Sequence, residues 1–222
     1  PAYKIASFEI TDIPLIELVA SKGKPIIIST GIAELEDIEL AIEACERMGN
    51  ENIAILKCTS SYPAPIEEAN MIMVKDFAER FNMIVGLSDH TIGSTAPVVA
   101  TCFGAKIIEK HFILDRSIGG PDSSFSMNEA EFTEMVKAVR EAEKAIGKVD
   151  YNLTDKQKKG KDFSRSLYIV ENIAEGEVLT EKNIRSIRPG FGLHPKFFKE
   201  VLGKKVKRNI EKGERLSLED LE

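Results

Sequence analysis

Only three histidines occur in this chain of 222 residues, and two of them follow neighbouring apolar runs. His90 comes directly after one run and His111 ends the next, so parallel strands would bring both imidazoles to one edge of a sheet. Two imidazoles with open positions suit a divalent metal whose shell is completed by water or substrate. The alternative is that each histidine only caps its strand by a hydrogen bond. His194 is interpreted as structural.

Lys4 and Lys110 lie inside apolar runs. Burying a lysine charge is costly unless an anion meets it. We predict that Lys4 binds a phosphate or carboxylate of a substrate, the alternative being a structural lysine that reaches solvent. Lys110 has the opposite strand parity to Glu109 and His111, so we interpret it as structural.

Carboxylates and hydroxyls follow the same runs. Glu9 and Glu109 could act as general acids or bases or bind sugar hydroxyls, although lone acids at strand ends often only cap helices. Asp122 lies in a glycine-rich loop that could close over a ligand, or it is a simple turn residue. Ser60 and Tyr62 belong to a hydroxyl cluster that could bind a polyol, or they form a polar loop tip.

A loop near the C-terminus, residues 188–192, combines Arg188 with a proline and two glycines. Proline fixes its own φ, so such a loop can hold a guanidinium rigidly toward an anion or an amide carbonyl. Cys58, which ends an apolar run, is interpreted as a buried wall residue.

Five short β-branched runs, alternating with helical patterns, must position these residues, and this alternation predicts a parallel sheet. The runs cover residues 3–7, 25–30, 53–59, 83–88 and 106–111. Residues 34–48 show helical spacing of apolar side chains. A later helix is predicted to begin at Ser126, an N-cap with Glu129 three residues on, and to end at Gly147. Its predicted buried face consists of Phe132, Met135, Val136, Val139 and Ile146.

Each of the five runs ends in a residue that could do chemistry: Ser7, Ser29, Thr59, Ser88 and Glu109. An open doubly wound sheet concentrates its chemistry at a switch point, whereas a (β/α)8 TIM barrel delivers every strand end to one site. The pattern therefore favours the α/β barrel. Because a barrel has eight units and typically about 250 residues, we expect about five of eight units here and about 100 further residues before Pro1.

Charge and composition divide the chain. Residues 1–155 contain 14 Lys and Arg against 25 Asp and Glu, whereas residues 156–222 contain 16 against 11. We predict the barrel part over residues 1–150, a Lys-rich linker over 151–162 and a small β domain over 163–222. Short strands are expected at residues 166–170, 178–179, 202–206 and 215–216.

The small domain repeats itself. The segment Asn172–Thr180 recurs 37 residues later as Asn209–Ser217, which predicts two pseudo-symmetric halves. A domain of about 60 residues is marginally stable alone, so we expect it to dock on the barrel or on a second subunit.

Several functional classes are excluded by composition. No run approaches the roughly 18 apolar residues of a membrane span, and no basic segment with interleaved aromatics suggests nucleic-acid binding. The first residues lack the pattern of a signal peptide, and three cysteines without metal-ligand spacing fit a reducing compartment. These features predict a cytoplasmic protein without membrane or nucleic-acid partners.

Taken together, the motifs resemble those of the nonulosonic (sialic) acid synthases, most closely the pseudaminic acid branch. The matching segments are residues 4–9, 29–31, 57–63, 86–90, 108–112 and 188–195, in order over essentially the whole chain. The resemblance implies a TIM barrel followed by an antifreeze-like (SAF, β-clip) domain. It also implies a domain-swapped homodimer in which each small domain covers the partner's barrel.

The resemblance further implies a transferase that condenses phosphoenolpyruvate with an N-acetylated aldose and releases phosphate. A divalent metal, Mn2+ or alternatively Mg2+ or Co2+, would be held by His90 and His111. Carried over by position, the phosphoenolpyruvate end would be bound by Lys4, Ser7, Ser29 and Ser88. The sugar or intermediate would face the candidate catalytic residues Glu9, Glu109 and Asp122 and the hydroxyls of Ser60 and Tyr62. Arg188 would reach the N-acetyl group from the other subunit.

Two departures from the family pattern concern the sugar. Ala6 and Phe8, and the segment Ser60–Tyr62, replace residues typical of N-acetylneuraminate synthases. The departures favour the diacetamido trideoxy sugar of the pseudaminic branch over N-acetylmannosamine. An N-acetylneuraminate or legionaminate synthase remains the alternative within the family, and a non-catalytic carbohydrate-binding protein is the alternative from another class.

Overall fold

The computed structural model describes residues 1–222, which form two compact units, Pro1–Lys148 and Val149–Glu222. No helix in either unit combines the length and the apolar character needed to cross a membrane.

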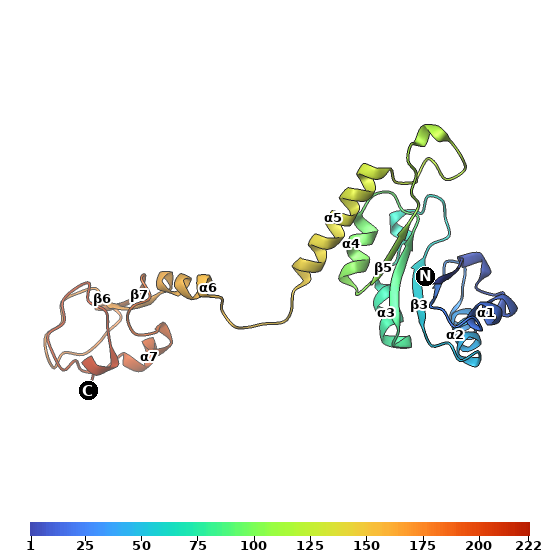
Figure 1. Cartoon of the computed structure of the whole chain (residues 1–222). Coiled ribbons are helices and arrows are strands. Elements are labelled where there is room, and N and C mark those ends of the chain that lie inside the picture. Colours follow the sequence, from blue (N-terminus) through green and yellow to red (C-terminus); the bar gives the residue numbers. More distant parts are fainter. The chain divides into compact units, whose positions relative to one another are not determined.

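The first unit is built on five parallel strands that follow one another in sequence order across the sheet (Figure 1). The strands are β1 (Tyr3–Ile5), β2 (Ile26–Ser29), β3 (Ile53–Cys58), β4 (Ile84–Asp89) and β5 (Ile107–Lys110). Each lies within one residue of a predicted run or inside it, so the predicted parallel sheet is confirmed. A doubly wound sheet reverses its strand order, whereas this order runs in one direction around a curled half-barrel, as the barrel prediction requires.

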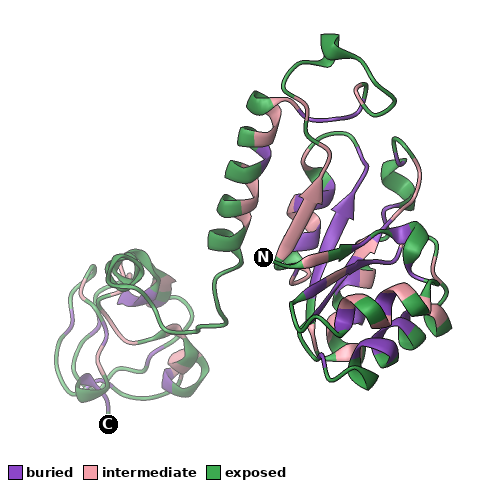
Figure 2. Cartoon of the chain, turned by 45° about the vertical axis from the view of Figure 1, so that its right-hand side comes forward, coloured by how far each residue is buried: buried purple, intermediate pink, exposed green.

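Helices cover the outer side of this sheet. They are α1 (Ile13–Ala20), α2 (Leu35–Arg47), α3 (Ile72–Phe81), α4 (Thr95–Cys102) and α5 (Glu129–Ile146). Figure 2 shows the central strands buried and the outward helix faces exposed. The predicted helix over residues 34–48 is confirmed as α2, which buries Ile38, Ala41, Ile42, Ala44 and Cys45. Single 3-10 turns occur at Ser7–Glu9 (η1), Ile66–Glu68 (η2), Arg116–Ile118 (η3), Lys161–Phe163 (η4), Pro195–Phe197 (η5) and Leu218–Asp220 (η6).

The prediction that Ser126 begins the last helix of this unit is wrong. Asn128 is the N-cap: its Oδ1 accepts the Glu131 N–H at 3.0 Å, and Glu131 accepts the Asn128 N–H at 2.9 Å. Ser126 instead donates its hydroxyl to the Asp122 carbonyl at 2.7 Å. The Met127 N–H bonds the His111 carbonyl at 2.9 Å and holds the chain extended there, so the helix cannot begin earlier.

The predicted apolar face of α5 is only partly buried. Met135 is buried, whereas Val136 and Ile146 are 41% and 52% exposed, and Phe132 and Val139 are half-buried. The main packing partner of this helix is α4, and part of its apolar stripe remains exposed.

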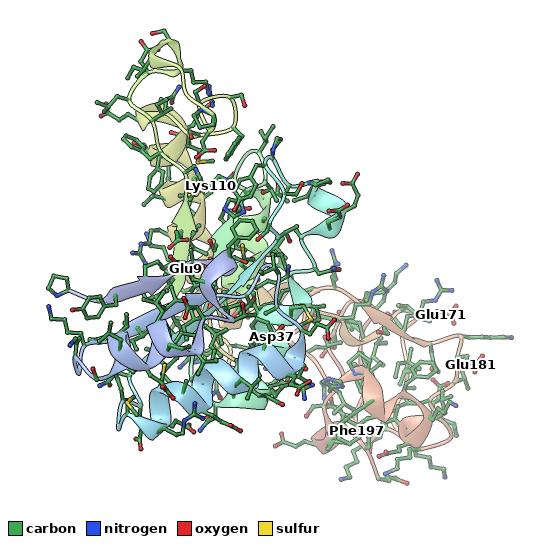
Figure 3. All side chains as sticks on the ribbon, turned by 90° about the vertical axis from the view of Figure 1, so that its right-hand side faces the viewer. Glu9, Asp37, Lys110, Glu171, Glu181 and Phe197 are labelled. Carbon is green, nitrogen blue, oxygen red and sulfur yellow. The ribbon has the colours of Figure 1, made fainter.

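Lys110 lies on β5 (Figure 3) and forms a buried ion pair. Its Nζ lies 2.6 Å from Asp89 Oδ2 and also donates to the carbonyls of Thr91 and Gly93, at 2.6 and 2.9 Å. The two charged side chains are 2% and 1% exposed. Asp89 Oδ1 accepts the Thr91 N–H at 2.8 Å. All three ammonium donors are satisfied, so the prediction that Lys110 is structural is confirmed.

The second unit contains two antiparallel strands, β6 (Ser166–Ile169) and β7 (Ile184–Ile187), and the short helices α6 (Asp155–Gly160) and α7 (Phe198–Val201). Strand β6 was predicted and β7 was not. The other expected strands form isolated bridges only, because turns interrupt their pairing after one residue. The Lys-rich segment expected as linker instead contains α6, capped by the Thr154 hydroxyl at the Gln157 N–H.

The internal repeat of this unit is confirmed by reciprocal hydrogen bonds. Ile173 and Ile210 exchange both backbone bonds, at 3.0 and 2.9 Å. Asn172 Oδ1 accepts the Lys212 N–H, and Asn209 Oδ1 accepts the Glu175 N–H, each at 2.8 Å. Corresponding residues of the two halves therefore make corresponding bonds. Their apolar side chains share one core of ten buried residues, among them Ile173 and Ile210.

Substitution of Lys110 should destabilise the first unit. In Lys110→Ala the Asp89 carboxylate stays buried without its counter-ion, a situation that costs about 3–5 kcal/mol of unfolding free energy. Urea denaturation followed by circular dichroism would measure the loss. Arg80→Ala is the matched control, because it removes the exposed Arg80–Asp76 pair on α3 and should leave the midpoint almost unchanged. Equal midpoint shifts in the two variants would contradict this account.

Candidate functional site

Four of the predicted site residues, each from a different strand, form one hydrogen-bonded group, which we call the Lys4 cluster. Lys4 Nζ on β1 donates to Ser29 Oγ at the end of β2, at 2.7 Å, and lies 3.6 Å from Glu109 Oε1 on β5. Ser88 Oγ on β4 donates to the same Glu109 oxygen at 2.6 Å. The parallel register places Ser88 directly beside Glu109.

The charged ends of the Lys4 cluster are open to solvent, while its hydroxyls are buried. The side chains of Lys4 and Glu109 are 33% and 43% exposed. Ser29 and Ser88 are 1% and 4% exposed. An anion arriving from solvent would therefore meet an ammonium with fixed hydroxyls beneath it, which suits a ligand with several oxygens.

His90 and His111, the predicted metal ligands, lie side by side. Their ring centroids are 5.2 Å apart, and the rings are inclined at 66°. His90 Nδ1 lies 2.8 Å from the Thr59 carbonyl, and since a carbonyl only accepts, Nδ1 carries a proton and Nε2 is the ring nitrogen that is not used in this bond. His111 Nδ1 lies 3.4 Å from Asp122 Oδ2. Burial, and then the nearby His90, lower the pKa of His111 and favour its neutral form.

This arrangement fits a divalent cation with two protein ligands. A carbonyl or carboxylate partner on Nδ1 is the usual device that orients a metal-binding imidazole and leaves Nε2 for the metal. No group of three or more His, Cys, Asp or Glu side chains in the chain converges as a metal cluster. Two imidazole ligands alone would leave coordination positions for substrate or water.

Aromatic rings line the imidazole pair. The Tyr62 ring centroid lies 4.3 Å from His90, and Phe125 lies 5.0 Å from His111 and 5.9 Å from Tyr62. Burial raises the pKa of Tyr62, so its hydroxyl is neutral and available as a hydrogen-bond donor. The loop that carries Asp122 thus contributes Phe125 as well, which the sequence patterns did not indicate.

A second pair of hydroxyls depends on Gly31. Ser60 Oγ donates to Ser7 Oγ at 3.0 Å. A Cβ at Gly31 would lie 2.3 Å from Ser60 Oγ and 2.7 Å from Ser7 Oγ, so only glycine leaves room for both hydroxyls. Cys58 Sγ lies 3.8 Å from His90 Nδ1. Burial raises the pKa of Cys58, and the neutral, buried thiol is the wall residue that was predicted.

Two predicted site residues are not brought into these groups. Glu9, labelled in Figure 3, accepts the Ala6 N–H at 2.8 Å and caps η1, which is the capping alternative considered for it. Arg188 lies in the second unit, where it is exposed and forms no ion pair. Sequence reasoning missed the Thr59 carbonyl, which fixes the tautomer of His90, because a backbone group has no signature in the sequence.

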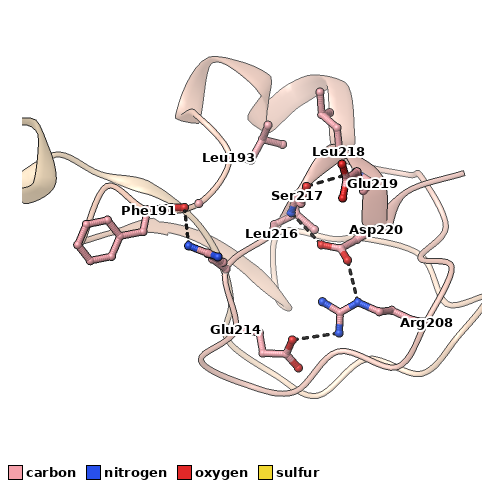
Figure 4. Close-up of a pocket in the computed structure, with 11 residues that line it drawn as sticks. Phe191, Leu193, Arg208, Glu214, Leu216, Ser217, Leu218, Glu219 and Asp220 are labelled. Atoms are coloured by element: carbon pink, nitrogen blue, oxygen red, sulfur yellow. Dashed lines mark hydrogen bonds and ion pairs between the residues drawn. The ribbon is translucent and has the colours of Figure 1, made fainter.

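The second unit has an open pocket of about 930 Å³ (Figure 4). Arg208 crosses it and bonds Asp220 and Glu214, at 2.8 and 3.0 Å. Its charges are thus paired within the pocket. Phe191, from the loop that follows Arg188, lines the same pocket.

Two family models match the chain. The model of the NeuB family matches residues 1–151, and that of the SAF domain matches residues 164–222. A pseudaminic acid synthase from Helicobacter pylori is 47% identical over 223 residues, covering 100% of this chain and 66% of the relative. An N,N'-diacetyllegionaminic acid synthase from Legionella pneumophila is 34% identical, covering 99% of this chain and 63% of the relative.

A solved structure agrees with these matches. The spore coat polysaccharide biosynthesis protein spsE from Bacillus subtilis has a TM-score of 0.63 and 36% identity, and the match covers 100% of this chain and 67% of that one. The chain spans about two thirds of the length of the curated relatives it matches. Because the NeuB family model matches well over half of its residues, the chain belongs to the NeuB family of sialic acid synthases.

Proposed function

We propose that this chain provides the greater part of a synthase that condenses phosphoenolpyruvate with 2,4-diacetamido-2,4,6-trideoxy-L-altropyranose and water, releasing phosphate. The observation that carries the proposal is the convergence of two groups at one edge of the sheet. One is the Lys4 cluster, which suits an anion, and the other is the imidazole pair with the hydroxyls and aromatic rings near it.

The Lys4 cluster is the proposed site for phosphoenolpyruvate. Its phosphate and carboxylate would take the Lys4 ammonium and the hydroxyls of Ser29 and Ser88 as donors. Before the substrate binds, Glu109 balances the ammonium charge, since its Oε1 lies 3.6 Å from Lys4 Nζ. The incoming anion would compete with this carboxylate for Lys4, so Glu109 becomes free to hold a sugar hydroxyl or to move a proton.

The sugar is proposed to lie beside the imidazole pair. Ser60 presents a hydroxyl that bonds Ser7, a residue proposed for the phosphoenolpyruvate end, and Tyr62 adds a neutral phenol next to His90. Asp122 can accept from a sugar hydroxyl with the oxygen that does not face His111. The neighbouring rings of Tyr62 and Phe125 offer apolar surface to the deoxy carbon and the acetamido methyl groups.

The reaction is a carbon–carbon bond formation followed by loss of phosphate. C3 of phosphoenolpyruvate adds to the aldehyde carbon of the open-chain sugar, which takes a proton at its oxygen, and C2 becomes an oxocarbenium-like centre. Water adds at C2 and gives up a proton, which Glu109, the carboxylate of the Lys4 cluster, can accept. The resulting tetrahedral carbon expels phosphate by cleavage of its C–O bond while its new hydroxyl gives up a proton to the leaving phosphate, which leaves a C2 ketone.

His90 and His111 are the proposed holders of a divalent cation, Mn2+ or alternatively Mg2+ or Co2+. The free Nε2 of His90 and the lowered pKa of His111 support this role. Such a cation supplies Lewis acidity at the aldehyde oxygen. Asp122 and the Thr59 carbonyl orient the imidazoles from behind.

The choice of sugar rests on similarity. The chain is 47% identical to the pseudaminic acid synthase of Helicobacter pylori and 34% identical to the legionaminic acid synthase, which supports the pseudaminic branch. A synthase for legionaminic or N-acetylneuraminic acid is the second candidate. A carbohydrate-binding protein without catalysis is less well supported, because binding a sugar requires neither the Lys4 cluster nor the imidazole pair.

We further propose a domain-swapped homodimer in which Arg188 reaches the sugar's N-acetyl group at the partner's barrel. The exposed, unpaired guanidinium of Arg188 supports this. We also propose a cytoplasmic location, as the sequence patterns predict.

The full-length protein should release phosphate from phosphoenolpyruvate and Mn2+ when the diacetamido trideoxy sugar is present. We expect kcat/KM for this sugar to exceed that for N-acetylmannosamine at least about 100-fold, because the site's polar groups would lack partners with the wrong sugar. A coupled phosphate assay measures both. Faster turnover of N-acetylmannosamine would move the chain to the sialic acid branch, and no turnover of any aldose would refute the synthase.

His90→Ala should lower Mn2+ affinity at least about 100-fold and abolish metal-dependent turnover, because one of two protein ligands is lost. Electron paramagnetic resonance titration of Mn2+ measures the binding without relying on activity. His194→Ala is the matched control, since that imidazole accepts the Lys196 N–H in the second unit. Unchanged Mn2+ affinity in His90→Ala would remove His90 from the ligand set.

Removing single hydroxyl groups should change KM for one substrate and not for the other. Ser29→Ala is expected to raise KM for phosphoenolpyruvate about tenfold, because it removes one hydrogen bond to a charged ligand, and to leave KM for the sugar unchanged. Ser60→Ala should do the reverse. Initial rates over a matrix of both substrates measure both constants. A rise of the same KM in the two variants would contradict the proposed arrangement.

A further inference from the structure

The loop that carries Arg188 is short and is anchored at both ends. It begins directly after Ile187, which pairs with Ser166 in the β6–β7 ladder. It ends at Leu193, whose carbonyl accepts the Leu167 N–H at 2.8 Å and whose N–H bonds the Leu216 carbonyl at 2.8 Å. The loop therefore consists of the five residues 188–192, which lie between the paired positions Ile187 and Leu193.

A single buried hydroxyl connects the two arms of this loop. Ser166 is 1% exposed. Its Oγ donates to the Pro189 carbonyl at 2.7 Å and accepts the Gly192 N–H at 2.8 Å. The hydroxyl thus uses its donor on Pro189, directly after Arg188, and an acceptor lone pair on Gly192, at the far end of the loop.

Further contacts restrict the same loop. The Gly190 N–H bonds the Asp162 carbonyl at 3.0 Å, and Arg215 Nη1 reaches the Phe191 carbonyl at 3.5 Å. A Cβ at Gly190 would lie 2.3 Å from Ser164 Oγ, and one at Gly192 would lie 2.7 Å from the Leu167 carbonyl. The loop is therefore packed closely against β6.

The one long polar side chain of the loop has no partner of its own. Arg188 is exposed and makes no ion pair or side-chain hydrogen bond in the described chain. A constrained backbone that presents an unpaired guanidinium is a means of holding that group for an external acceptor, since the entropy of ordering the loop is already lost before binding.

We propose that Ser166 is a positioning residue for substrate recognition: its bridging hydroxyl fixes the loop that presents Arg188 to the acetamido carbonyl of the sugar. The inference rests on the proposed function for the identity of the ligand. The bridge itself depends only on the geometry of the second unit. Without the hydroxyl, the Pro189 carbonyl and the Gly192 N–H lose their partners, and the arms of the loop can separate.

The first test measures the loop directly. In Ser166→Ala, amide hydrogen exchange of Gly192, followed by NMR on the 222-residue chain, should accelerate at least about tenfold, because its acceptor is gone. Ser164→Ala is the matched control: this neighbouring serine is exposed and its hydroxyl makes no hydrogen bond, so Gly192 exchange should not change. An unchanged exchange rate in Ser166→Ala would overturn the proposed bridge.

The second test uses the full-length protein and a double-mutant cycle. Ser166→Ala should raise KM for the sugar about tenfold, the value of one charge-assisted hydrogen bond, without changing KM for phosphoenolpyruvate. In the Arg188→Ala background the same change should have no further effect, because the group that it positions is absent. An unchanged sugar KM, or an equal rise in both backgrounds, would overturn the positioning role.

Failure of the proposed function would look different. If the wild-type protein turned over no aldose, the synthase assignment would fall, while the exchange rate of Gly192 would still decide whether Ser166 holds the loop.

Discussion

The parallel register of the sheet is the constraint on which the site depends. Because every strand runs in the same direction and follows its neighbour in sequence order, every C-terminal end lies at the same edge. The pairing of β4 with β5 sets Ser88 beside Glu109, and that of β1 with β2 lets Lys4 reach Ser29. A slip of one residue in any strand would turn these side chains toward the helices.

The same register separates two lysines with different roles. Lys110 faces the helices, where Asp89 and two carbonyls satisfy it completely in a buried position. Lys4 reaches the strand-end edge, where the Ile5 carbonyl, the Ser29 hydroxyl and a more distant carboxylate contact it but leave it partly exposed and able to bind an added anion. Burial therefore makes one ion pair a structural element, while exposure keeps the other exchangeable.

The positions of the five strands of the first unit and of most site residues could be predicted from the sequence, because these strand ends are marked by apolar runs that stop at Ser, Glu or His. Three features could not. Ser126 and Asn128 both fit the capping pattern, and only the pairing of Met127 with His111 decides between them. The tautomer of His90 depends on a backbone carbonyl.

The third feature concerns Glu9, for which sequence alone left capping and catalysis equally open. In the structure its carboxylate caps η1 at the Ala6 N–H. Local hydrogen bonding of this kind depends on the path of the backbone after β1, and residue types do not determine that path. The repeat in the second unit could be predicted from the sequence. The reciprocal asparagine bonds could not, since the sequence does not say which atoms of the two halves bond to each other.

The central claim is that the Lys4 cluster binds phosphoenolpyruvate and that the imidazole pair holds the divalent cation in the same active site. Anomalous diffraction from crystals of the full-length protein soaked with Mn2+ and phosphoenolpyruvate tests it most directly. The account predicts a manganese peak within coordination distance of a nitrogen of both His90 and His111. It also predicts phosphoenolpyruvate oxygens in hydrogen-bond contact with Lys4 and Ser29. Manganese bound elsewhere, or phosphoenolpyruvate away from Lys4, would contradict it.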